Sequence, residues 1–161
     1  MEAHRVSLAE TDAGGIVYHA RYFDMAERSR NEAMRSVGVP VAELLRKSRE
    51  GVLGTALVVH SVFAKFFAPA FLDDVLHLQT YIRKLNRARS SWRTAITRDG
   101  APICTVDVDL VSLNVATGEP VLIAEDLVDA LDAIPRETVV PTAARPSQAA
   151  SGFRRRVSAP S

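Results

Sequence analysis

The chain has 161 residues, of which 47% are hydrophobic and 24% charged, which is typical of a single globular domain with a sizeable core. Its formal net charge of +1 does not indicate a nucleic-acid partner or a general attraction to membranes. The single cysteine, Cys104, excludes an internal disulfide, and no apolar leader or membrane-length run is present, so we expect a cytoplasmic protein without a membrane span.

The first third of the chain is predicted to contain a short strand and two helices. Residues 3–9 suit a strand, and residues 21–37 repeat with the period of a helix. One stripe of that helix collects small and apolar side chains, namely Tyr22, Met25, Ala26, Ser29, Ala33 and Val37. Small side chains permit close approach, so this helix is predicted to lie tightly against a sheet. Gly38 ends it, and residues 41–49 predict a second, shorter helix.

The rest of the folded part is predicted to consist of hairpin-linked strands. Four segments have the composition or alternation of strands: 52–64, 75–83, 90–98 and 101–113. Asp99-Gly100 predicts a tight turn, and residues 120–134 carry a last strand or helix. This order indicates an α+β domain over residues 1–134, with a curved antiparallel sheet around the long helix. Residues 135–161, rich in Pro, Ala, Ser and Arg, are expected to form a disordered tail.

The stretch ETDAGGIVYHA, residues 10–20, places an acid, two glycines and a histidine where the long helix begins. Unpaired N–H groups at a helix N-terminus favour developing negative charge. A carboxylate beside them suits acyl transfer, with Asp12 as general base or nucleophile and the N–H groups as oxyanion donors. His19 is a candidate to orient water or move a proton. The alternatives are that Asp12 only caps its own turn and that His19 has no chemical role.

This stretch closely resembles the signature of the hot-dog-fold acyl-CoA thioesterases of the 4-hydroxybenzoyl-CoA thioesterase class, and in particular their Tol-Pal-associated branch. The matching positions are Thr11, Asp12, Ala13, Gly14, Gly15, Ile16, Val17, Tyr18, His19, Tyr22, Glu27 and Arg28. The segment FFAPAFLDD, residues 66–74, is similar to a turn of the same family. The resemblance covers about residues 4–132, and it implies a hot-dog fold.

The resemblance also implies roles for individual residues. Asp12 falls on the catalytic aspartate, and the backbone N–H at position 19 falls on the donor to the thioester carbonyl. His19 matches a histidine of the Tol-Pal-associated branch. Tyr18 and Tyr22 are expected to wall the substrate cleft, with Gly15 beside the substrate. The family further implies a homodimer or homotetramer with the site at the dimer interface, and no cofactor apart from the coenzyme A of the substrate.

Three features depart from the family pattern. Glu10 stands where an aspartate is usual, which makes the first acid of the motif longer. The segment PVLIAED, residues 120–126, lacks an Arg-x-x-Pro element that the family often carries in its late strand. The C-terminal segment is also longer than the family pattern predicts. None of these departures touches Asp12, but the second bears on the shape of the acyl pocket.

The segment IRKLNRARSSWR, residues 82–93, carries five basic side chains. Arg87 and Arg89 are the candidates for binding the phosphates of coenzyme A, and the alternative is a solvated hairpin with surface charge. Trp92 is expected in the core of the sheet. No set of His, Cys, Asp or Glu residues has the spacing of metal ligands, so no metal is predicted.

The predicted function is hydrolysis of a short-chain aliphatic or aromatic acyl-CoA to the free acid and CoA. The alternative from another class is a non-catalytic acyl-CoA-binding or cell-envelope-associated interaction protein with the same fold. A hot-dog dehydratase is disfavoured because the signature is of the thioesterase type. A G-x-S-x-G elbow is absent from the sequence, which disfavours an α/β-hydrolase mechanism. The sequence does not predict the acyl chain that is preferred.

Overall fold

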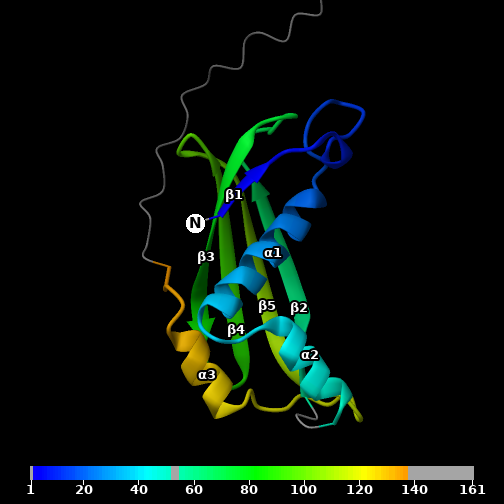
Figure 1. The fold of residues 1–161 in the computed structure, drawn as a ribbon, viewed down its shortest axis with the longest axis vertical. Coiled ribbons are helices and arrows are strands. Elements are labelled where there is room, and N and C mark those ends of the chain that lie inside the picture. The colour runs from blue at the N-terminus through cyan, green and yellow to red at the C-terminus, as the bar shows by residue number, and fades with distance from the viewer. Residues whose placement is uncertain (1, 52–54, 138–161) are drawn as a thin grey trace, which may run out of the picture.

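Five antiparallel strands form one curved sheet in the order β1-β3-β4-β5-β2 (Figure 1). The computed structural model describes residues 2–51 and 55–137. The strands are β1 (Glu2–Arg5), β2 (Thr55–Phe66), β3 (Val75–Leu85), β4 (Arg89–Arg98) and β5 (Ala101–Asn114). The four predicted strands after the helices are therefore confirmed, with ends that differ by a few residues, while β1 is shorter than predicted. Residues 52–54 of the first of these strands lie outside the described residues.

The turns between β3, β4 and β5 follow from their sequences. Asp99 and Gly100 both have positive φ, at 51° and 78°, which closes the predicted β4–β5 hairpin. At the other end, the Asn86 side chain accepts hydrogen bonds from the N–H groups of Ala88 and Arg89, both at 2.9 Å, and so shapes the β3–β4 turn. The three strands form a meander, and β2 lies beside β5 at the far edge.

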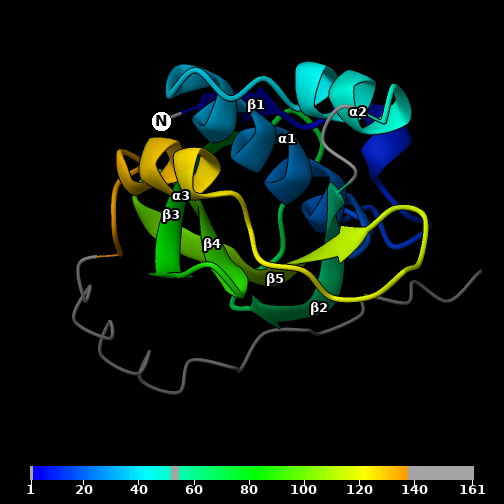
Figure 2. The same ribbon diagram turned by 90° about the horizontal axis from the view of Figure 1, so that it is seen from below.

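Helix α1 (Arg21–Ser36) crosses one face of the sheet, with α2 (Val41–Arg49) and α3 (Glu125–Asp132) on the same side (Figure 2). Its buried residues are Tyr22, Met25, Ala26, Ser29, Arg30 and Met34. The predicted stripe is confirmed for its first four members, whereas Ala33 and Val37 are only partly buried. Its small members allow α1 to pack closely on β3, β4 and β5. Residues 120–134, predicted as a strand or a helix, contain α3.

The core lies between α1 and the concave face of the sheet. Alternation along β5 puts Cys104, Val106, Val108 and Leu110 inside, as predicted. Trp92 is buried, and its indole N–H donates to Ser90 Oγ at 3.0 Å. Burial raises the pKa of the Cys104 thiol to about 12, so this thiol stays protonated at neutral pH. Cys104 is thus a packing residue.

A chain of three buried hydroxyl groups joins α1 to the sheet. Ser29 Oγ lies 2.8 Å from Thr80 Oγ1 on β3, and Thr80 Oγ1 lies 2.9 Å from Thr94 Oγ1 on β4. All three side chains are buried, so each hydroxyl depends on its neighbour for a hydrogen-bond partner. This chain links α1 to β3 and β4.

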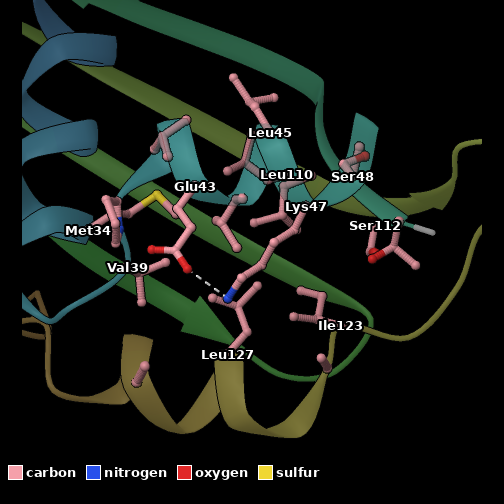
Figure 3. Close-up of a pocket in the computed structure, with 18 of the residues that line it drawn as sticks. Met34, Val39, Glu43, Leu45, Lys47, Ser48, Leu110, Ser112, Ile123 and Leu127 are labelled. Atoms are coloured by element: carbon pink, nitrogen blue, oxygen red, sulfur yellow. Dashed lines mark ion pairs between the residues drawn. The ribbon is translucent and has the colours of Figure 1, made fainter. Parts of the chain in front are cut away.

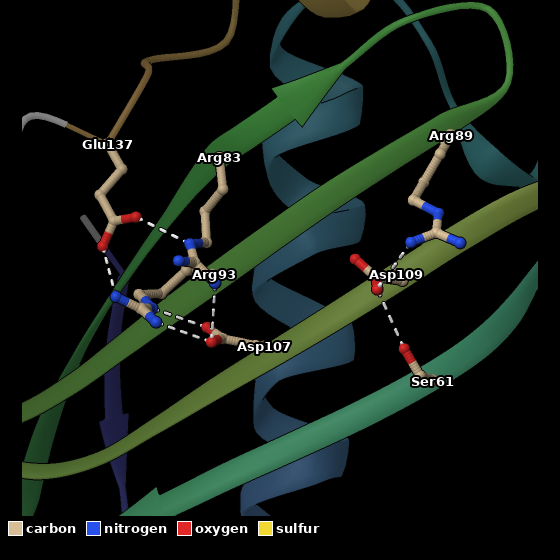
Figure 4. A network of polar contacts seen from close by, with 7 residues as sticks. All are labelled: Ser61, Arg83, Arg89, Arg93, Asp107, Asp109 and Glu137. Carbon is tan, nitrogen blue, oxygen red and sulfur yellow. Dashed lines mark hydrogen bonds and ion pairs between the residues drawn. The ribbon is translucent and has the colours of Figure 1, made fainter.

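The outer face of the sheet carries a network of charges (Figure 4). Arg93 forms a bidentate pair with Asp107, with distances of 2.6 and 2.7 Å, and also contacts Glu137 at 2.6 Å. Arg83 bonds the same two carboxylates. The backbone of residues 135–137 runs beside Ile82 of β3, so these three residues, predicted in the tail, lie along the sheet. The rest of the predicted tail, residues 138–161, is outside the described residues.

The described helices give no indication of a transmembrane segment, because none is long and apolar enough to cross a membrane.

Candidate active site

The loop before α1 is anchored by Glu10. Residues Leu8–Glu10 form a single 3₁₀ turn, η1, where the sequence predicted a continuing strand. Its cause is a capping box, because Glu10 accepts hydrogen bonds from the N–H of Ser7 at 2.7 Å and from Ser7 Oγ at 2.9 Å. Burial alone would raise the pKa of Glu10, but the Ser7 hydrogen bonds and His4 outweigh it, so its pKa lies below the ordinary value.

Asp12 sits at the tip of the following turn. Its carboxylate Oδ1 accepts a hydrogen bond from the N–H of Gly14 at 2.7 Å, and its backbone carbonyl accepts one from the N–H of Gly15 at 2.9 Å. Gly15 has a φ of 77°, which a side chain would oppose. The turn that the sequence offered as an alternative to chemistry is therefore formed. It leaves Asp12 exposed, and within the described residues its second carboxylate oxygen has no hydrogen-bond partner.

The start of α1 lies directly after this turn. The N–H of Tyr18 donates to the Glu10 carbonyl at 2.8 Å, which ties the turn to the helix. The N–H groups of His19 and Ala20 donate to no acceptor in the part of the chain that the structure describes. His19 is exposed, and its ring packs against that of Tyr18 with centroids 4.4 Å apart. A carboxylate and free helix-end donors thus occur on one short segment, as an oxyanion site requires.

Tyr22 lies deeper than the other predicted site residues. Only 3% of it is exposed, and its ring packs against Phe66 at the end of β2, with centroids 5.6 Å apart. Burial raises the pKa of its hydroxyl to about 12, so Tyr22 is neutral at physiological pH. In the single chain Tyr22 is a core residue, whereas Tyr18 is exposed.

Arg87 and Arg89 lie at the other end of the sheet from Asp12. The Asp12 turn is bonded to the segment just before β3, through the N–H of Val17 and the carbonyl of Ala70 at 2.9 Å. Arg87 and Arg89 follow the far end of β3, whose eleven residues separate them from that segment. A strand of that length spans roughly 35 Å. One chain therefore does not bring these arginines to Asp12; Arg89 instead pairs with Asp109 at 3.6 Å.

The edge strand β2 exposes apolar side chains on both of its faces. Phe63, on the outer face, is 66% exposed. Val59 pairs with the buried Leu110 and so points to the core side, yet 53% of it is exposed. A long apolar edge strand is a template for pairing with another chain. The sequence predicted the strand and a sheet with one unpaired edge, but not that this strand would form the edge that no other described strand covers.

A cavity of about 490 Å³ opens between α1, α2, α3 and the start of β2 (Figure 3). Its wall is mostly apolar and includes Met34, Val39, Leu44, Leu57, Leu110, Ile123 and Leu127. Lys47 and Glu43 of α2 form an ion pair at 2.9 Å on this wall. Arg30 also lines the cavity. Neither the cavity nor the burial of Arg30 was predicted from the sequence, because an arginine on an amphipathic helix is normally exposed.

Among residues 2–51 and 55–137, no group of three or more His, Cys, Asp or Glu side chains is placed to hold a metal ion. The candidate functional features in the described residues are therefore the Asp12 turn, the start of α1, the β2 edge and the cavity.

Comparison with known proteins identifies relatives of the whole domain. A family described as the Thioesterase-like superfamily matches residues 6–131. The Acyl-CoA thioesterase YbgC of Haemophilus influenzae is 28% identical over 123 residues, which is 76% of this chain and 87% of that protein. The Acyl-CoA thioester hydrolase YbgC of Escherichia coli is 38% identical over 81 residues, so the match spans only 50% of this chain and 56% of that protein.

The fold has a matching crystal structure. A probable thioesterase from Bartonella henselae is 33% identical and superposes with a TM-score of 0.67, over 76% of this chain and 97% of that chain. Together with the curved antiparallel sheet around α1, this confirms the predicted α+β hot-dog fold.

Proposed function

We propose that this chain, which belongs to the Thioesterase-like superfamily, hydrolyses acyl-CoA thioesters to a free acid and CoA. The observation that carries the proposal is an exposed carboxylate, Asp12, on the same short segment as helix-end N–H groups that have no acceptor in the described residues. The names of the curated relatives from Haemophilus influenzae and Escherichia coli support the same reaction. We extend the proposal to the 4-hydroxybenzoyl-CoA thioesterase class and its Tol-Pal-associated branch.

The proposed mechanism assigns a task to each part. The N–H of His19 donates to the thioester oxygen and stabilises the negative charge that develops there. Asp12 acts either as a base that removes a proton from the attacking water or as a nucleophile that forms an anhydride, which water then opens. The carbon–sulfur bond breaks and the electron pair leaves with the thiolate of CoA, which takes up a proton. The His19 side chain orients the water, and Tyr18 and Gly15 border the substrate.

A homodimer built through β2 would complete this site. Antiparallel pairing of two β2 strands buries the exposed side chains of Val59 and Phe63 and removes the unpaired edge. It also sets the Phe66 end of one strand, which contacts Tyr22 in the first turn of α1, against the Thr55 end of its partner. That end of the partner carries the cavity and lies near the partner turn with Arg87 and Arg89. We therefore assign the CoA phosphates to Arg87 and Arg89 of the second protomer, and two such dimers would form a tetramer.

The proposal is tested by release of free thiol from a panel of short-chain, long-chain and aromatic acyl-CoA substrates. Wild type is compared with Asp12→Asn and with Asp24→Asn, which removes an exposed carboxylate from the first turn of α1. We expect turnover in wild type and in Asp24→Asn, and a loss of at least about 100-fold in Asp12→Asn. Equal rates in wild type and Asp12→Asn would refute the assigned mechanism.

Absence of turnover on every substrate, together with binding of acyl-CoA, would instead favour the non-catalytic acyl-CoA-binding protein. Analytical ultracentrifugation of wild type and Phe63→Lys tests the dimer, because a lysine on the edge strand opposes pairing. A cytoplasmic location and the absence of a cofactor other than the CoA of the substrate complete the proposal.

A further inference from the structure

Arg30 is a buried cation without a counterion among the residues that the structure describes. It lies in the middle of α1, and only 8% of it is exposed. No described carboxylate lies within the 4.0 Å of an ion pair, and no described group accepts a hydrogen bond from its side chain. Burial lowers the pKa of the Arg30 guanidinium, and the charge of nearby Glu27 opposes this shift. An arginine nevertheless stays charged at neutral pH.

The Arg30 nitrogens are not sealed in the core, and Arg30 is one of the residues that line the cavity. Throughout the described part of the chain, every fully buried side-chain nitrogen or oxygen has a hydrogen-bond partner. Arg30 has none, so its nitrogens retain accessible surface. The cavity between α1, α2 and β2 is the described space that the Arg30 residue lines. A desolvated charge without a partner costs free energy that an incoming anion would recover.

The rest of the cavity is suited to hydrocarbon. Its volume of about 490 Å³ is in the range of small-molecule sites, and side chains of Met34, Val39, Leu110 and Leu127 form its wall (Figure 3). Its other cation, Lys47, is already paired with Glu43. Two further carboxylates, those of Glu27 and Asp126, are exposed on residues that line the cavity. One unpaired guanidinium close to acidic groups favours a monovalent anion over a phosphate.

We propose that this cavity binds an alkyl chain that carries a carboxylate, with the carboxylate paired to Arg30 and the chain packed on the apolar wall. The planar fork of a guanidinium matches the two oxygens of a carboxylate. Such a ligand has two sources: a free fatty acid, or the acyl group of a thioester with a carboxylate at its far end. The second source rests on the proposed function, whereas the first does not.

Binding is measured by isothermal titration calorimetry with octanoate and, as a neutral chain of the same length, octanamide. The variants are Arg30→Met, Arg30→Lys and the control Arg35→Met, which removes an exposed arginine from the same helix outside the cavity. We expect Arg30→Met to weaken octanoate binding by about 10- to 100-fold and to leave octanamide binding unchanged. Arg30→Lys keeps the charge and loses the fork, so its affinity should be intermediate.

Thermal unfolding of Arg30→Met checks that the variant is folded. We expect a midpoint no lower than that of wild type, because methionine has a similar length and removes the buried charge. Glu27→Gln gives a test of opposite sign, since it removes a carboxylate that competes for Arg30 and should tighten octanoate binding.

Kinetics with hexanoyl-CoA and adipoyl-CoA, which differ by a terminal carboxylate, distinguish the two sources. A preference of wild type for adipoyl-CoA that Arg30→Met abolishes would identify the acyl group as the ligand. Octanoate binding that depends on Arg30 without such a preference would identify the free acid. If neither thioester reacts, the proposed function fails and calorimetry alone decides the ligand. The proposal is overturned if wild type shows no preference for adipoyl-CoA and calorimetry also gives a negative result. The negative result is either equal affinity of wild type and Arg30→Met for octanoate, or binding of octanoate to wild type that is no tighter than that of octanamide.

Discussion

The buried hydroxyl chain Ser29–Thr80–Thr94 allows a sharp prediction for stability. Thr80 is its central member, and Thr80→Val keeps the shape of the side chain while removing the hydroxyl. Ser29 and Thr94 are then buried without their shared partner. Leaving a buried polar group unsatisfied costs about 1–3 kcal/mol, so the single variant should lose roughly 2–4 kcal/mol of unfolding free energy. Replacing all three hydroxyls in Ser29→Ala/Thr80→Val/Thr94→Val should bring the loss back to within about 1 kcal/mol.

The assay is urea unfolding followed by the fluorescence of Trp92, the only tryptophan, which is buried in the same core. At a slope of about 2 kcal/mol per M, Thr80→Val should lower the midpoint by about 1–2 M. Thr105→Val, at a half-buried position on the outer face, is the control and should change little. All measurements use one protein concentration, because self-association would shift the midpoint. A triple variant less stable than Thr80→Val would refute the reasoning.

Three further predictions concern the loop and the outer face. The pKa values of Glu10 and Asp74 are lowered in the folded state, so both carboxylates lose their contribution to stability as the pH falls below their unfolded-state pKa values of 4.5 and 3.8. Acid unfolding should begin in this range, and Glu10→Gln should make the urea midpoint less dependent on pH. Gly14→Ala would place a Cβ 3.0 Å from Asp12 Oδ1, so thiol-release rates should fall roughly tenfold while thermal unfolding changes little. A double-mutant cycle of Arg93→Met and Asp107→Asn should give a coupling free energy of unfolding of about 1–2 kcal/mol. A value near zero would show that this ion pair does not contribute to stability.

The sequence predicted the parts of the fold that depend on local periodicity. The stripe of small residues on α1 and the alternation of Cys104, Val106 and Val108 on β5 are both confirmed, because one buried face fixes the pattern. It also predicted the Asp99-Gly100 hairpin. The 3₁₀ turn at Leu8–Glu10 was missed although its signal was present, since Ser7 and Glu10 have the spacing of a capping box.

Features that depend on which faces meet were not predicted. Arg30 occupies a helix position that propensity alone allows to be exposed, and only the placement of α2 and β2 encloses it. The exposed side of β2 likewise depends on α1 packing over β3, β4 and β5. At the candidate site, the sequence predicted the acid and the helix end. The hydrogen bond from the N–H of Gly14 to Asp12 required the structure.

The separation of Asp12 from Arg87 and Arg89 by the length of β3 has a genetic consequence. Suppose that each working site needs Asp12 from one protomer and the two arginines from the other. In a mixed dimer, the loss of Asp12 in one chain and the loss of the arginines in the other then fall on the same site. Pairing an Asp12→Asn chain with an Arg87→Ala/Arg89→Ala chain gives one site with every defect and one site with none. Two inactive chains expressed together in equal amounts would then complement each other and recover about a quarter of the wild-type activity, since half of random dimers are mixed.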